Sequence, residues 1–203
     1  MGKLVVTEFV TLDGVAQAPG APDEDAEHGF TQGGWQEPLS DEESGTVMFE
    51  QAKTMDALLL GRKTYEIFAG YWPTAPDGVP FTELLNRVPK YVASRTLGEP
   101  LDWDGSVVVG ESLAEDVAAL KGRHDQVHVI GSLDLVQSLL RFGLVDRLNL
   151  WMYPVLLGTG KRVFDHGTVP AVLRLIESVT YPRGTVQLTY DLAGTPTYGT
   201  MGS

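Results

Sequence analysis

Short apolar runs that alternate with helix-like segments constrain the fold more than any other feature of this sequence. Three largely apolar runs, at residues 57–60, 90–93 and 127–130, are each followed at once by a Gly or a Ser. Runs of this length between helical patterns are typical of parallel strands buried on both faces. The pattern predicts an α/β protein with a mostly parallel mixed sheet between two layers of helices.

The C-terminal part of the sequence changes character. Residues 145–156 form a long strand-like run, and residues 172–192 indicate two strands joined near residues 182–184. This predicts a C-terminal antiparallel hairpin at one edge of the sheet. With 203 residues, we expect one domain over residues 1–192, followed by a Gly- and Thr-rich flexible tail at residues 193–203.

The N-terminal half holds one strand and two irregular stretches. Residues 3–12 read as the first strand, and residues 16–38, dense in Gly, Pro and acids, are expected to form a lid. Ser40 and Glu43 fit a capping box, which predicts a helix that starts there. Residues 71–88 contain three prolines and are interpreted as an insertion outside the core. Further helices are predicted at residues 65–70, 113–121 and 133–142.

Charge and composition exclude several classes of function. A formal net charge of −12 argues against a broad basic face for nucleic acid. The sequence has no cysteine, which excludes disulfides and thiolate metal sites, and we expect no metal site of another kind. No apolar stretch reaches membrane-spanning length, and no signal peptide precedes the first strand, so a cytoplasmic protein without a membrane partner is expected.

Polar loops follow the three apolar runs. They are Gly61–Thr64, Ser94–Thr96 and Gly131–Ser132, and the carboxyl ends of parallel strands meet at one edge of a sheet. Glycines allow close backbone approach, helix starts offer free N–H groups, and the Arg and Lys side chains add positive charge. Together the loops suit phosphates, although each one alone also fits an ordinary strand–helix turn.

The same loops, in this order, resemble the dihydrofolate reductase superfamily, and most closely the reductase domain of riboflavin biosynthesis. The resemblance covers nearly the whole chain and implies a three-layer α/β/α fold. It is carried by Thr11-Leu12-Asp13-Gly14, Leu59-Leu60-Gly61-Arg62-Lys63-Thr64-Tyr65-Glu66, Val92-Ala93-Ser94-Arg95-Thr96, Val129-Ile130-Gly131-Ser132, Leu144-Val145-Asp146-Arg147-Leu148 and residues 154–164.

The resemblance implies that NADPH is the cofactor and is preferred over NADH. In that family the first two loops hold the pyrophosphate and the 2′-phosphate, and the Gly-rich strand end holds the pyrophosphate. The residues to which the resemblance assigns cofactor binding are Gly61, Arg62, Lys63, Thr64, Ser94, Arg95, Thr96, Gly131, Ser132, Leu133 and Leu135. It also places the loop at residues 158–161 near the substrate or cofactor.

Catalysis and substrate binding are harder to assign. Asp13, at the end of the first strand, is the first choice for a catalytic residue, although Asp-Gly is also a turn signal. The carboxylate that classical dihydrofolate reductases carry in the helix before the first loop falls here at Gly45. Glu43 is a nearby acidic candidate that equally fits a helix start. The candidate substrate-binding residues, of which the aromatic ones also fit a core, are Gly14, Trp35, Phe49 and Tyr153.

Three functions remain open at this point. The first is an NADPH-dependent reductase of a pyrimidine- or pterin-like heterocycle, similar to the 5-amino-6-(5-phosphoribosylamino)uracil reductase of riboflavin biosynthesis. The second is a dihydrofolate reductase, and the third is a nucleotide-binding protein of the same fold without turnover. The resemblance further implies a homodimer built on the C-terminal strands.

Overall fold

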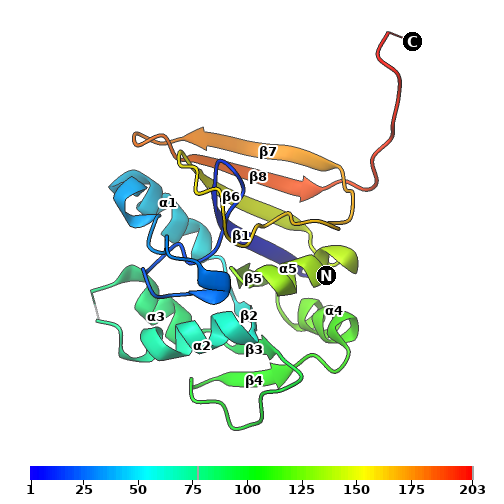
Figure 1. Cartoon of the computed structure of the whole chain (residues 1–203). Coiled ribbons are helices and arrows are strands. Elements are labelled where there is room, and N and C mark those ends of the chain that lie inside the picture. Colours follow the sequence, from blue (N-terminus) through cyan, green and yellow to red (C-terminus); the bar gives the residue numbers. More distant parts are fainter. Residues whose placement is uncertain (77, 203) are drawn as a thin grey trace.

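The computed structural model describes residues 1–76 and 78–202. These residues form one eight-stranded sheet with helices packed on it (Figure 1). Asp77, in the predicted insertion, and Ser203, in the predicted tail, lie outside the described residues. The strands are β1 Lys3–Thr11, β2 Ala57–Gly61, β3 Lys90–Ala93, β4 Ser106–Val109, β5 Gln126–Ile130, β6 Arg147–Tyr153, β7 Leu173–Thr180 and β8 Val186–Leu192. Their order across the sheet is β4-β3-β2-β5-β1-β6-β8-β7.

Six of these strands run parallel, and the last two form the antiparallel edge. β8 pairs antiparallel with both β6 and β7, whereas β1 pairs parallel with β5 and with β6. The hairpin of β7 and β8 is therefore the one that the sequence predicts. The fold class, a mostly parallel mixed sheet with a C-terminal antiparallel hairpin, is confirmed.

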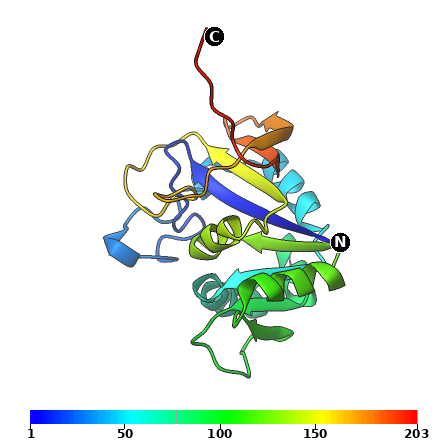
Figure 2. The ribbon, with the colours of Figure 1, turned by 90° about the vertical axis from the view of Figure 1, so that its right-hand side faces the viewer.

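Helices cover both faces of the sheet, as the edge-on view in Figure 2 shows. They are α1 Glu42–Ala52, α2 Arg62–Tyr71, α3 Pro80–Arg87, α4 Leu113–Arg123 and α5 Leu133–Arg141, with short 3-10 turns at Glu27–Gly29, Glu37–Leu39 and Trp72–Thr74. None of the described helices has both the length and the apolar character that a membrane span requires. The layer arrangement follows from side-chain alternation along the strands.

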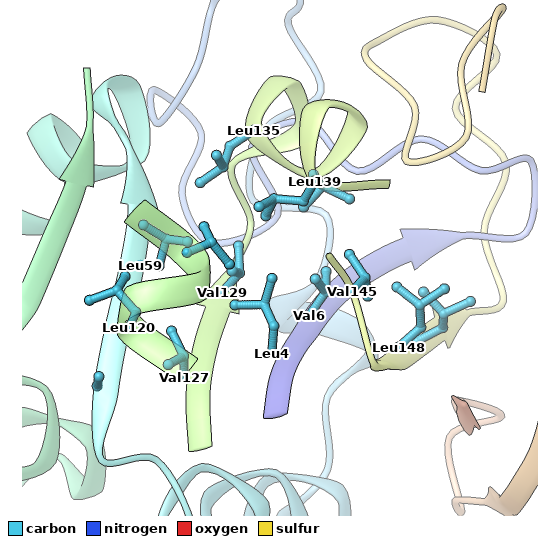
Figure 3. Packing of buried hydrophobic residues seen from close by; sticks show 14 residues of the cluster. Leu4, Val6, Leu59, Leu120, Val127, Val129, Leu135, Leu139, Val145 and Leu148 are labelled. Atoms are coloured by element: carbon cyan, nitrogen blue, oxygen red, sulfur yellow. The ribbon is translucent and has the colours of Figure 1, made fainter. Parts of the chain in front are cut away.

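The strand β2 shows this alternation clearly. Leu58 and Leu60 pack with residues of α1, α2 and α3, whereas Ala57 and Leu59 pack with residues of α4 and α5. Figure 3 shows the second of these clusters, in which Leu120 of α4 lies near Leu59. Each fully buried leucine stabilises the fold by about 1.5–3 kcal/mol, so the apolar runs of the sequence are the core itself.

Two predictions about the first half of the chain are wrong in detail. α1 is capped by Asp41, whose carboxylate accepts from the Ser44 N–H at 2.8 Å, and not by the predicted pair of Ser40 and Glu43. The Asp41 N–H in turn donates to Ser44 Oγ. Ser40 lies one residue before the cap, and its hydroxyl donates to the Gln36 carbonyl.

The proline-rich stretch is part of the core rather than an insertion. Its helix α3 buries Leu84 and Leu85, and Val88 follows in the same cluster. Pro80 stands in the first turn of this helix, where a missing N–H costs nothing. The prolines therefore start a packed helix, and their number in the sequence concealed it.

The remaining segments are irregular. Residues 193–202 form no helix or strand, and the ribbon leaves the sheet beyond β8 (Figure 1). Residues 16–38 contain only two 3-10 turns, yet Ala18, Phe30 and Trp35 in this stretch are buried. The predicted lid is thus an irregular loop that is packed against the protein.

Candidate functional site

A cleft of about 800 Å³ runs along the edge of the sheet where β2, β3 and β5 end. Every residue to which the sequence assigns cofactor binding lines this cleft. The structure therefore brings together three loops that lie far apart in the sequence. Their binding of a cofactor stays a prediction.

Two of the loops are joined by a direct hydrogen bond. The Gly61 N–H donates to Ser132 Oγ at 2.9 Å. Gly131 and Ser132 both have a left-handed backbone, with φ of 63° and 67°, and a side chain at Gly131 would lie 3.7 Å from Thr64. The starts of α2 and α5 thus lie side by side at the cleft, and a helix start is a typical anion site.

The third loop presents an arginine to solvent. Ser94 Oγ accepts from the Thr96 and Leu97 N–H groups, both at 3.1 Å, which holds the turn in shape. Arg95, at the tip of this turn, is exposed and makes no ion pair with any residue in the described ranges. Its guanidinium is available for a phosphate monoester.

Two further cations of the cleft, in the loop after β2, already have carboxylate partners. Arg62 contacts Glu66 one helical turn further on, at 2.9 Å. Lys63 Nζ pairs with Glu27 and lies 3.6 Å from Asp25, and both acids belong to the irregular loop of residues 16–38. A phosphate at Lys63 has to compete with these acids.

Lys161 binds the same two acids, and Gln17, within the loop, holds their backbone. Lys161 Nζ lies 2.6 Å from both Asp25 and Glu27. Gln17 is buried, and its side-chain amide donates to the carbonyl groups of Asp25 and Glu27.

Sequence reasoning placed the loop at residues 158–161 near the site, which agrees with Lys161 lining the cleft. Sequence reasoning did not identify Asp25 and Glu27, which pair with Lys63 and Lys161. The sequence signal for them was the cluster of acids in the loop of residues 16–38.

Sequence reasoning also missed Glu8, in the middle of β1. This residue is 2% exposed and lines the cleft. Its Oε1 atom has no hydrogen-bond partner among the residues that the structure describes. Burial raises the pKa of Glu8 to about 8, so its carboxyl group is protonated at neutral pH. A single acid inside an apolar strand was the only sequence signal.

A second, smaller cavity of about 30 Å³ lies on the α1 face of the sheet. It is lined by Thr7, Phe9, Met48, Gln51, Ala52, Phe81, His128, Ile130 and Trp151. Phe9 and Ile130 line both this cavity and the large cleft. Burial lowers the pKa of His128 to about 4, so its imidazole is neutral. The Trp151 Nε1 has no partner among residues 1–76 and 78–202.

Asp13 is held in a different environment from the cleft. Its carboxylate accepts from the Thr11 hydroxyl at 2.6 Å and from the Gly158 N–H at 2.8 Å. The Thr11 hydrogen bond, supported by the backbone N–H groups of residues 157 and 158, lowers the pKa of Asp13. Asp13 and Gly14 are not among the residues that line either cavity. This geometry is that of a carboxylate that orders a loop.

The remaining candidates divide between core and surface. Trp35 and Tyr153 are buried and contact each other edge to face, with ring centroids 5.6 Å apart. Phe49 packs against Phe81 behind the small cavity. Glu43 is exposed in the first turn of α1. The structure does not bring these side chains into the cleft.

Comparison with known protein families bears on this geometry. The family of the RibD C-terminal domain matches residues 2–187. The chain belongs to the RibD C-terminal domain family. Among curated proteins, this RibD C-terminal domain is 31% identical over 146 residues to the uncharacterised protein YyaP of Bacillus subtilis (strain 168), covering 69% of this chain and 76% of YyaP.

Solved structures share the fold of this RibD C-terminal domain at lower identity. A putative riboflavin biosynthesis protein from Shewanella sp. PV-4 superposes with a TM-score of 0.71 at 20% identity, covering 94% of this chain and 99% of that one. Dihydrofolate reductase from Enterococcus faecalis, complexed with NADP(H) and RAB-propyl, has a TM-score of 0.58 at 17% identity, covering 94% and 96%. The sequence resemblance to this superfamily is confirmed, and family membership supports a reductase-type function.

Proposed function

We propose that this protein is an NADPH-dependent reductase of a neutral, planar nitrogen heterocycle of the pyrimidine or pterin type. The observation that carries the proposal is the single cleft in which the three polar loops meet. Free helix N–H groups and the unpaired Arg95 suit a pyrophosphate and a 2′-phosphate, respectively. NADH lacks the second of these groups, so the preference for NADPH follows from Arg95.

The cofactor, when bound, supplies a hydride, and the residues of the chain bind and orient the two reactants. The large cleft and the small cavity share Phe9 and Ile130 as lining residues. The small cavity, at about 30 Å³, has room for about one water molecule, so a flat ring requires it to widen. A ring bound there would meet a dinucleotide in the cleft at these two side chains. Hydride transfer needs such contact, because effective reaction requires the reacting atoms to be held close together.

The small cavity favours an uncharged ring. Its polar groups are Gln51, the neutral His128 and the unpartnered indole N–H of Trp151, which donate and accept hydrogen bonds without charge. No Asp or Glu occurs among the described residues that line it. α1 presents Met48, Gln51 and Ala52 there, and the exposed Gly45 does not line it. This composition speaks against dihydrofolate reduction.

Titration of the protein with NADPH and with NADH tests the cofactor. We expect NADPH to bind at least tenfold more tightly, because a charge-assisted contact to a phosphate contributes about 1.5–3 kcal/mol. Equal, millimolar binding of the two nucleotides contradicts the proposal.

Turnover is tested separately, by following NADPH oxidation with a panel of pyrimidine and pterin compounds. One observation favours a second candidate, a nucleotide-binding protein without turnover: Asp13, the acid first chosen for catalysis, is engaged in ordering a loop. Tight NADPH binding with no oxidation across the panel selects that candidate. Oxidation with any compound of the panel selects the reductase.

A further inference from the structure

Glu8 is the one acid of β1 that faces the layer of α4 and α5. Side chains alternate along a strand, so Glu8 lies on the same face as Val6 and Val10. Its partner in β6 is Leu150. The apolar groups nearby on this face include Leu133 and Val163, which pack around Val10. The carboxyl group is therefore set into apolar surroundings at the floor of the cleft.

A buried acid of this kind destabilises a fold. A polar atom removed from water without a partner loses its hydrogen bonds to solvent, and an apolar side chain of similar size would pack there without that loss. Oxygen Oε1 of Glu8 is in this situation within the described part of the chain. A buried polar group that lowers the stability of the fold is typical of a ligand site.

The position of Glu8 along the cleft indicates which part of a ligand it meets. The loops after β3, β2 and β5 carry Arg95, Lys63 and Gly131 in that order, and β1 is the next strand across the sheet. Neighbouring strands lie about 4.8 Å apart, so β1 is about 14 Å from β3. The Gly131 N–H donates to the carbonyl of Thr7, the residue before Glu8.

This order fixes the direction of an extended dinucleotide. With the 2′-phosphate at Arg95 and the pyrophosphate between the loops after β2 and β5, the half beyond the pyrophosphate reaches β1. That half of NADPH is the nicotinamide riboside. It carries a carboxamide and ribose hydroxyl groups, all of them neutral hydrogen-bonding groups.

Resting on the proposed cofactor, we propose that the carboxyl group of Glu8 hydrogen bonds the nicotinamide riboside half of NADPH. A protonated carboxyl group offers one O–H donor and one carbonyl acceptor, which complement an amide or a hydroxyl group. An ionised carboxylate in this place would repel the neighbouring pyrophosphate. Glu8 is thus a binding residue for the cofactor, outside the three phosphate loops.

Binding of two ligands to two variants tests this proposal. NADPH has the nicotinamide riboside half, whereas adenosine 2′,5′-bisphosphate keeps the adenosine and the 2′-phosphate but lacks that half. Glu8→Leu keeps the bulk of the side chain and removes both hydrogen-bonding atoms. We expect it to weaken NADPH binding about tenfold and to leave adenosine 2′,5′-bisphosphate within about twofold. Glu8→Gln keeps a donor and an acceptor, and should bind NADPH within about threefold of the wild type.

Asp134→Asn is the matched control. Asp134 is an exposed acid in the first turn of α5 and lines the same cleft. Its neutralisation changes the charge near the phosphates, so it should alter the affinity for both ligands by similar factors. Circular dichroism of each variant establishes that it is folded.

The outcomes separate this proposal from the proposed function. If the wild-type protein binds neither ligand, the cofactor assignment fails. If it binds both, and Glu8→Leu binds both as the wild type does or weakens both equally, the assignment to Glu8 is overturned while the cofactor stands. A selective loss of NADPH affinity in Glu8→Leu, and not in Glu8→Gln, supports the proposal.

Discussion

Lys63 of the β2–α2 junction and Glu27 of the irregular loop form an ion pair, and both residues line the cleft. Asp25 and Lys161 join the same cluster. The cluster links a residue expected to bind phosphate to a loop that borders the ligand space. Since both acids also line the cleft, the loop and a phosphate compete for the same ammonium group.

Removal of one acid should therefore favour the nucleotide. We expect Glu27→Gln to raise the affinity for NADPH about threefold, because exposed ion pairs of this kind contribute below about 1 kcal/mol. Isothermal titration measures the change. Glu37→Gln is the control, since Glu37 is an exposed acid of the same loop that forms none of these pairs in the described structure. A weaker affinity in Glu27→Gln shows instead that the pair closes the loop over the ligand.

Glu8 should make stability depend on pH in a characteristic way. Its pKa is raised from an ordinary value of 4.5 to about 8 in the folded protein. Below pH 4.5 the Glu8 carboxyl group is protonated in both the folded and the unfolded state, so its titration does not lower the stability of the fold. As the pH rises from 4.5 to about 8, the unfolded state ionises and the folded state does not, and the free energy of unfolding falls by about 1.4 kcal/mol per pH unit.

Urea unfolding of the wild type and of Glu8→Gln across this range measures the effect. The variant cannot ionise, so its stability advantage over the wild type should increase from pH 4.5 to pH 8 and then level off. Because both proteins share all other titrating groups, the difference isolates Glu8. A difference that stays constant with pH shows that Glu8 is not protonated in the folded state.

Asp13 should matter for stability more than for binding. Its carboxylate accepts from the Thr11 hydroxyl and from the Gly158 N–H, and an amide group in Asp13→Asn can supply only one accepting oxygen. We expect the variant to lose about 1–2 kcal/mol of unfolding free energy, with the NADPH affinity unchanged within about twofold. Its low folded pKa means that this contribution is present at neutral pH and disappears as the pH falls through that pKa.

A catalytic Asp13 predicts the reverse pattern. In that case Asp13→Asn would fold with nearly the stability of the wild type and would lose NADPH oxidation with any substrate that the wild type reduces. Measuring unfolding and turnover on the same preparations distinguishes the two roles.

The sheet and the three polar loops could be predicted from the sequence because local patterns encode them. Apolar runs of four or five residues, such as residues 57–60, can only be buried strands in this context, and the Gly or Ser that follows each run marks its end. All the loops of parallel strands then meet at one edge. The N-terminus of α1 was misplaced by one residue because Asp41, Ser40 and Ser44 are all good capping residues.

Other features depend on contacts that no local pattern records. Pro80 and its neighbours look like a loop in the sequence, and only packing against β2 and β3 makes α3 part of the core. Asp13 carries a turn signal, and its engagement with Gly158 joins residues that are 145 positions apart. The apolar burial of Glu8 likewise comes from β6 and α5, which follow it by more than a hundred residues.

Binding of NADPH and NADH to the wild type and to Arg95→Ala tests the central claim most directly. Arg95 is the exposed arginine of the loop after β3 and has no carboxylate partner in the described structure, and a guanidinium contact to a phosphate contributes about 1.5–3 kcal/mol. Arg87→Ala is the control, since Arg87 is an exposed arginine on α3 outside the cleft. We predict that Arg95→Ala loses at least tenfold in NADPH affinity and almost none in NADH affinity, whereas Arg87→Ala changes neither. Unchanged discrimination between the two nucleotides in Arg95→Ala would contradict the account.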